Sequence, residues 1–199
     1  MTLKSKILAG AVLLAFGAQA ATAAIPRSGT LTFDVIRKGQ DIGDISYVFS
    51  RKNKTINVKI HTDIVVKAPI IGITMYSFQQ NSAERWQDDR LIGLASNTND
   101  NGTRHSTKSG PTNLIPASLW NDAIVNQTSL LNTINGNVMN VRVQKLGTAQ
   151  VKTQSGTVRA THYTLTGGLE RELWFDANGV LAQVRFNAED GSVVTYVRR

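Results

Sequence analysis

Residues 84–105 read ERWQDDRLIGLASNTNDNGTRH, and this stretch decides the fold. Two clusters of turn-forming residues, Asp88-Asp89 and Asn99-Asp100-Asn101-Gly102, separate its three strand-like parts. Asn-Gly and similar pairs between strand-forming runs favour tight hairpin turns. The stretch therefore predicts strand, turn, strand, turn, strand, with a dense set of chemically able side chains.

A similar pattern recurs 88 residues later, where Glu172-Leu173-Trp174 repeats the Glu-x-Trp of residues 84–86. Turn residues follow at Asp176-Ala177-Asn178-Gly179 and Glu189-Asp190-Gly191-Ser192. Asn178-Gly179 after a strand is the strongest hairpin signal in the chain. A coincidence between two similar hairpins accounts for the match, and so does a large curved sheet made of two like halves.

Alternating apolar residues predict further strands on both sides of this stretch. They occur in short runs separated by turn residues: Leu31, Phe33, Val35; Ile45, Tyr47, Phe49; Ile56, Val58, Ile60; Met139, Val141, Val143; Val180, Ala182, Val184, Phe186. We therefore expect an all-β fold, a large curved antiparallel meander or half-open barrel of about 10–11 strands. Ser118 after Pro116 predicts the N-cap of one short central helical segment that ends near Ile134.

The N-terminus has the layout of a secretory signal peptide. Lys4 and Lys6 precede an apolar run of ten residues, Ile7 to Phe16, and small residues suited to cleavage follow at 18–23. Such a run is too short to cross a bilayer, which needs ~20 residues. We expect residues 1–23 to be removed, a periplasmic or secreted protein, and no stable membrane insertion.

The remaining residues, 24–199, are expected to form a single β domain. It consists of two similar halves, 30–108 and 137–199, joined by a linker and the short helix in 109–136. Removal of Lys4 and Lys6 with residues 1–23 lowers the net charge from +8 to +6. A role in solubility is enough to explain this positive charge. Scattered basic residues do not indicate nucleic-acid binding.

The fourth strand places aromatic and polar residues on one face. An unbroken strand would put Tyr76, Phe78, Gln80, Ser82, Glu84 and Trp86 together. A dry core does not accept polar groups without partners, whereas a concave face lining a wet groove does. The alternative is a bulge near residues 79–81 that returns Glu84 to solvent.

No familiar catalytic motif is present, and the chain has no cysteine. The three histidines lack the spacing of metal ligands, so we expect neither a metal nor a cofactor. Glu84 and His105 could act as an acid–base pair, with Arg104 holding an anion. Turn formation alone explains Asp100, however, so a structural role is favoured for the set Glu84, Asp100, Arg104 and His105. The tryptophans are likewise expected to anchor the core.

Several short motifs together resemble one family of bacterial exported proteins. They are Phe33-Asp34-Val35 with Gly39 and Ile42-Gly43; Glu84-x-Trp86; Asn101-Gly102-Thr103-Arg104-His105; Leu119-Trp120-Asn121; and Leu173-Trp174-Phe175-Asp176 with Asp190-Gly191 and Tyr196. The family is classed only as a domain of unknown function. The resemblance covers nearly all of residues 24–199 and implies an all-β periplasmic domain without a known activity. At the level of fold the layout is also distantly similar to half-barrel lipoprotein carriers.

Three functions fit these observations. The first is a non-catalytic binding or carrier protein for an amphiphilic envelope ligand, a lipid or glycan. Its ligand-binding residues would be Glu84, Trp86, Arg104, His105 and Trp120. The second is a cell-envelope hydrolase that uses Glu84 and His105. The third is an envelope assembly or interaction protein that offers a sheet edge to a partner.

Overall fold

The structure is a computed structural model, and it describes residues 24–68 and 70–199. Thirteen strands form one sheet in the order β6-β5-β4-β3-β2-β1-β13-β12-β11-β10-β9-β8-β7. The strands are β1 (Thr30–Arg37), β2 (Gln40–Lys52), β3 (Thr55–Lys67), β4 (Thr74–Gln87), β5 (Arg90–Asp100), β6 (Thr103–Ser109), β7 (Ile115–Pro116), β8 (Ser129–Leu131), β9 (Val138–Thr153), β10 (Gly156–Gly167), β11 (Arg171–Asp176), β12 (Leu181–Asn187) and β13 (Val193–Arg198). The predicted signal peptide, residues 1–23, lies outside the described residues.

The all-β, largely antiparallel fold is confirmed, with two differences in the segment that connects the halves. This segment contains the short strands β7 and β8, so the described part of the chain has 13 strands and not 10–11. Its helical part is a single 3-10 turn, η1 (Asp122–Asn126), capped by Asn121 instead of Ser118. Asparagine and β-branched residues, which are poor α-helix formers, explain why the turn does not continue.

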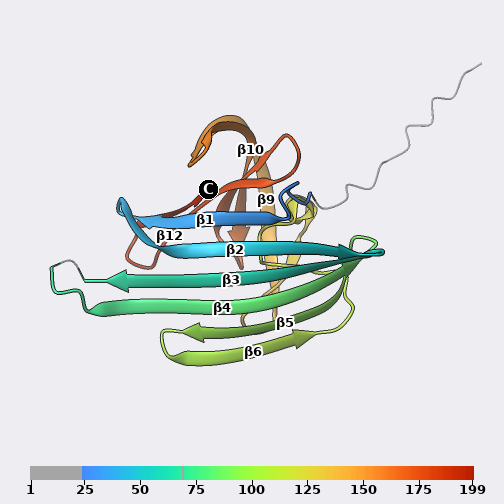
Figure 1. Ribbon diagram of the computed structural model, residues 1–199, viewed down its shortest axis with the longest axis horizontal. Helices are drawn as coiled ribbons and strands as arrows, with labels where there is room; N and C mark the ends of the chain where they lie inside the picture. Colours follow the sequence, from blue (N-terminus) through green and yellow to red (C-terminus); the bar gives the residue numbers. More distant parts are fainter. Residues whose placement is uncertain (1–23, 69) are drawn as a thin grey trace, which may run out of the picture.

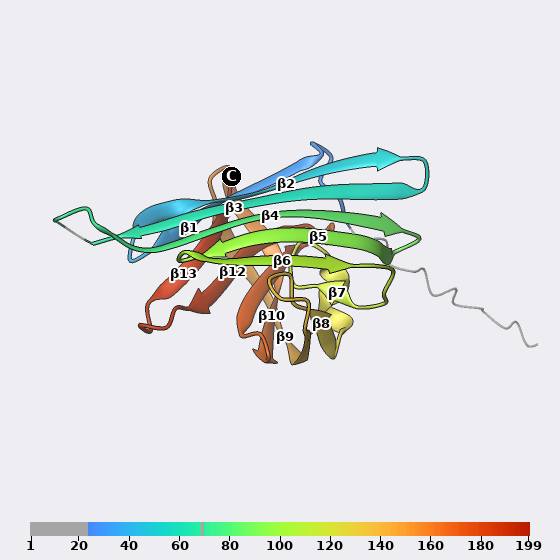
Figure 2. The same ribbon diagram turned by 90° about the horizontal axis from the view of Figure 1, so that it is seen from below.

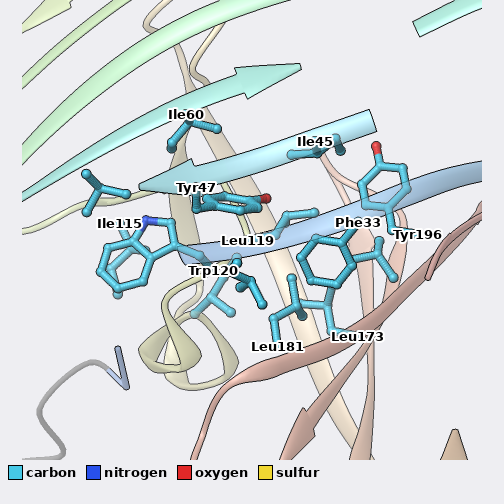
Figure 3. Close-up of a cluster of buried hydrophobic side chains, with 14 of the residues drawn as sticks. Phe33, Ile45, Tyr47, Ile60, Ile115, Leu119, Trp120, Leu173, Leu181 and Tyr196 are labelled. Atoms are coloured by element: carbon cyan, nitrogen blue, oxygen red, sulfur yellow. The ribbon is translucent and has the colours of Figure 1, made fainter. Parts of the chain in front are cut away.

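The two halves of the sheet cross one another and enclose the core. Strands β1–β6 form one layer of long strands, and β8, β9, β10, β12 and β13 run across beneath it (Figures 1 and 2). Residues from both layers and from the connecting segment meet in one apolar cluster, including Phe33, Tyr47, Trp120, Leu173 and Leu181 (Figure 3). The positive φ at Asn101 and Gly102 confirms the predicted turn between β5 and β6.

The β9–β10 hairpin folds back over the other face of the sheet. The pairing of β9 with β10 shifts register between His162 and Tyr163, next to Gly147 at φ 120°. At the end of the hairpin, Gln154 donates from its backbone N–H to the carbonyl of Arg198 at 2.8 Å and from Nε2 to Asp34 Oδ2 at 2.8 Å. A second, smaller apolar cluster lies under this hairpin: Val151, Ala160, Trp174 and Ala182.

The sheet ends at β6 and β7 and does not close into a barrel. The loop before β9 bridges part of the gap, because Thr107 Oγ1 on β6 donates to the carbonyl of Ile134 at 2.6 Å. The sheet is therefore a half-open barrel.

Among the described residues, no helix has the length and apolar character needed to span a bilayer.

Gly43 allows β2 and β3 to pair closely beside a break in the β1–β2 register. Its φ is +143°, and a Cβ atom there would lie 1.9 Å from the carbonyl oxygen of Asp63. We expect Gly43→Ala to lower the free energy of unfolding by about 2 kcal/mol or more, since the clash is with backbone. Gly93→Ala is the matched control, because a Cβ at Gly93 meets nothing within 4 Å. Urea unfolding of both variants tests this, and equal losses would contradict it.

Candidate ligand-binding site

Strand β4 turns its polar and aromatic residues toward the interior. Its pairing with β3 runs without a break from Tyr76 to Gln87. Gln80, Ser82, Glu84 and Trp86 are all buried. The alternative of a bulge at residues 79–81 is therefore wrong, and the inward placement of Glu84 is confirmed. A register shift occurs instead in the pairing of β4 with β5, next to Trp86.

The buried polar residues of this face pair with one another across strands. Gln80 Nε2 donates to Thr98 Oγ1 at 2.8 Å, and Ser82 Oγ donates to Ser96 Oγ at 2.9 Å. Buried polar groups are tolerated when they are hydrogen-bonded in this way. A dry interior thus accommodates the polar residues that suggested a wet groove.

Glu84 lies at the centre of an aromatic cluster and is only 1% exposed. Its Oε2 accepts hydrogen bonds from the indole N–H of Trp86 at 2.8 Å and from that of Trp120 at 2.9 Å. The two indoles meet edge to face with ring centroids 5.7 Å apart, and Trp120 also packs against Phe49. Three of the five predicted ligand-binding residues, Glu84, Trp86 and Trp120, are therefore together.

Burial raises the pKa of Glu84, and the two indoles and the nearby Ser118 hydroxyl oppose this only in part. Oε1 is buried without a hydrogen-bond partner, so no bond of ordinary geometry joins it to Ser118. Since Oε2 accepts two N–H groups, Oε1 is the oxygen left to hold a proton. Next to this group, Tyr47 Oη donates to the carbonyl of Ser118 at 2.9 Å.

The structure separates Arg104 and His105 from this cluster. Arg104 is exposed, and His105 is partly exposed on β6. His105 pairs with Thr98 of β5, whereas Glu84 pairs with Leu94, four residues away. Two strand spacings and four residues correspond to about 10 Å across and about 13 Å along the sheet. The predicted acid–base pair of Glu84 and His105 does not form.

Neither of two open hollows on the described surface is lined by any of the five predicted residues. The first, of about 250 Å³, lies between η1 and strands β10 and β11, with Asp122, Val125, Thr161, Tyr163, Phe175 and Asp176 in its wall. The second, of about 320 Å³, lies between the segment from Pro26 to Thr32 and the C-terminal Arg198 and Arg199. The ligand-binding role of Glu84, Trp86, Arg104, His105 and Trp120 stays a prediction.

Asp122 is a polar residue in the first hollow that the sequence analysis did not single out. Its Oδ1 is buried without a hydrogen-bond partner. Burial raises the pKa of Asp122, and neighbouring backbone N–H groups oppose this only in part. The only signal for it was its place in Asn121-Asp122, where a capping residue begins a helical turn.

The second Glu-x-Trp has surroundings unlike those of the first. Trp174 lies on the face covered by the β9–β10 hairpin and stacks on His162 at 4.1 Å between centroids. Glu172 accepts from His162 Nε2 at 2.8 Å and from Arg185 Nε and Nη2 at 2.9 and 2.7 Å. This cluster links β10, β11 and β12, and its side chains bind one another. No group of three or more His, Asp or Glu residues suited to a metal ion occurs in the described part of the chain.

Comparison with protein families finds a match over residues 33–199 to the model described as "Domain of unknown function (DUF6134)". The chain belongs to this family. Comparison with curated proteins finds no match. Among solved structures, a β-barrel-like protein of domain of unknown function DUF1849 from Brucella abortus is similar, with a TM-score of 0.51 and 10% identity over 84% of this chain and 94% of that chain. At that identity the likeness shows the fold alone.

In this member of the DUF6134 family, the indole N–H groups of Trp86 and Trp120 share one hydrogen-bond acceptor, Oε2 of Glu84. Glu84→Leu would leave both donors buried without an acceptor, at about 1–3 kcal/mol each. Glu84→Gln retains an amide oxygen in the same place. We expect Glu84→Leu to lower the free energy of unfolding by about 2–5 kcal/mol and Glu84→Gln by less than half of that. Urea unfolding at pH 5 measures both, and similar losses would count against the shared acceptor.

The raised pKa of Glu84 also predicts a pH dependence of stability. Just above its ordinary pKa of 4.5, Glu84 is ionised to a smaller extent in the folded chain than in the unfolded one, because burial raises its pKa. Its contribution to stability therefore falls as pH rises, by about 1.4 kcal/mol per pH unit until the folded-state pKa is reached. We expect Glu84→Gln to gain on the wild type between pH 4.5 and pH 7 in urea unfolding. Glu170→Gln, at an exposed site, controls for the lost charge; a constant difference between Glu84→Gln and wild type would refute the prediction.

Proposed function

We propose that this protein is an exported, non-catalytic binding protein that holds part of an amphiphilic envelope ligand, a lipid or glycan. The observation that supports this best is the first hollow, between η1 and strands β10 and β11. The signal-like layout of residues 1–23 supports export, because it combines basic residues, a short apolar run and small residues.

The wall of this hollow contains both apolar and polar residues. Val125, Tyr163 and Phe175 supply apolar and aromatic surface, and Tyr163 and Phe175 are an edge-to-face pair 6.4 Å apart. Asp122 and Asp176 supply carboxyl groups. Small-molecule sites commonly combine a mainly apolar lining with a few polar groups. An amphiphile matches both kinds of lining residue.

Asp122 favours a ligand that donates hydrogen bonds. A hydroxyl or amine could donate to the Asp122 carboxyl group in the wall of the hollow, and such groups are plentiful on glycans and on some lipid headgroups. Arg198 occupies Asp176 Oδ2 at 3.0 Å, so Asp122 is the freer carboxyl group. At about 250 Å³ the hollow is smaller than a typical site for a drug-sized molecule, and it suits a headgroup or the end of a chain.

The enzyme hypothesis has lost its proposed catalytic pair, because Glu84 is enclosed by two indoles and lies far from His105. The His162–Glu172 pair does not replace it. Glu172 is already held by Arg185 with two hydrogen bonds, and His162 is stacked on Trp174. These contacts favour a structural role and leave binding as the better-supported function.

Filling the hollow should prevent binding without unfolding the protein. Val125 is half-buried in the wall, and Val125→Trp would occupy much of the space. We expect wild-type protein purified from a membrane-containing lysate to show a bound lipid or glycan in native mass spectrometry, with at least tenfold less on Val125→Trp. Val193→Trp, at a position that is 48% exposed and outside the hollow, is the matched control. A wild type without bound ligand, or equal occupancy in both variants, would overturn the proposal.

A further inference from the structure

The connection between β3 and β4 projects beyond the rest of the sheet (Figures 1 and 2). Pairing of β2 with β3 ends at Ile64, and pairing of β5 with β4 ends at Phe78. Between these points β3 and β4 pair only with each other, as far as Lys67 and Thr74. We call residues 65–68 and 70–76 the β3–β4 tip. The tip is a two-stranded ribbon with no neighbouring strand on either side.

The β3–β4 tip is apolar and exposed to an unusual degree for a water-soluble surface. Ile70 is fully exposed, and the exposed fractions of Ile71, Ile73 and Met75 are 68%, 61% and 67%. From Ile64 to Phe78 the sequence contains one charged residue, Lys67, and no acidic residue. Contiguous apolar patches of this kind mark sites of interaction with proteins or membranes.

The apolar residues lie on both faces of the ribbon. Val66 and Tyr76 are paired and share the face of the buried Gln80, whereas Met75 lies on the opposite face. Docking into a protein groove or against another sheet requires one apolar face. Side chains that are apolar all round the tip suit immersion in a fluid apolar medium. We propose that the β3–β4 tip inserts reversibly into the outer part of a lipid bilayer.

The polar groups around the tip fit a shallow insertion. Ala68 N–H donates to the carbonyl of Ile73 at 2.8 Å, and Gly72 N–H donates to that of Ala68 at 3.1 Å, which lowers the cost of taking this backbone out of water. Lys67 has a long apolar stem and can keep its ammonium group among the headgroups. Tyr76 Oη donates to Asp100 at 2.9 Å and marks where the polar body begins. Three to four residues of ribbon beyond Tyr76 extend about 10 Å, the depth of interfacial anchors.

This inference is independent of the first hollow, so either can fail alone. The test is flotation of full-length protein with vesicles of phosphatidylethanolamine and phosphatidylglycerol, all variants sharing one N-terminus. We expect the double variant Ile71→Asp/Ile73→Asp to lower the vesicle-bound fraction at least tenfold. Val138→Asp/Val193→Asp adds the same charge at apolar positions that are 58% and 48% exposed, and should bind as the wild type does.

A reporter at the tip separates insertion from surface attraction. Trp86, Trp120 and Trp174 are buried, so an added tryptophan in Ile71→Trp would dominate any change on vesicle addition. We expect a blue shift of its emission and quenching by lipids brominated along the acyl chain. Equal flotation of wild type and Ile71→Asp/Ile73→Asp, or an unshifted and unquenched Ile71→Trp, would overturn the proposal. The proposal would also fail if the wild type did not bind vesicles but self-associated, and if Ile71→Asp/Ile73→Asp abolished this self-association. The tip would then join two copies of the chain.

Discussion

Oε2 of Glu84 accepts hydrogen bonds from two indoles in separate parts of the chain, Trp86 on β4 and Trp120 before η1. The segment around Trp120 has little regular structure of its own, since β7 and β8 contain two and three residues. Tertiary contacts hold it in position. Trp120 packs against Phe49 and Trp86, and the Ser118 carbonyl accepts a hydrogen bond from Tyr47. Leu119 even adopts a φ of +69°, which costs about 1–2 kcal/mol for a residue with a side chain. Because this segment leads into β8 and β9, the same contacts help to set how the second half crosses the first.

Among the described residues, side chains occupy much of the concave face of the curved sheet. Polar side chains of β4 and β5 bond to each other, and the aromatic cluster around Glu84 fills the space near the other end of β4. Interiors packed in this way leave few voids larger than a water molecule. One open hollow lies outside this packed region, between η1 and strands β10 and β11.

Much of the fold could be predicted because period-two alternation and turn residues act locally. The inward parity of β4 was one of two alternatives that residues 76–86 left open, and the Asn101-Gly102 turn followed from its residue types. The contacts of Glu84 could not be predicted, since Trp120 lies 36 residues away and no local rule pairs them. The pairing of β9 with β10 shifts register at His162, opposite Gly147, and this glycine was a local sign of a bulge that the sequence analysis missed. The exposure of the apolar run from Ile70 to Phe78 could not be predicted, because hydrophobicity alone does not tell whether such a run is buried.

The two Glu-x-Trp motifs show why internal similarity does not make the halves equivalent. Glu84 is enclosed in the main core, whereas Glu172 lies on the opposite face of the sheet and binds Arg185 and His162. The length of β4 separates the two proposed surfaces, the β3–β4 tip and the first hollow. The β3–β4 tip begins near Tyr76, while η1 follows Trp120, which packs on Trp86 at the other end of β4. Ten residues of strand span about 33 Å. A molecule docked on a bilayer by its tip would thus hold the first hollow away from the lipid, open to the aqueous side, so a ligand there would have to be received from solution or from another protein.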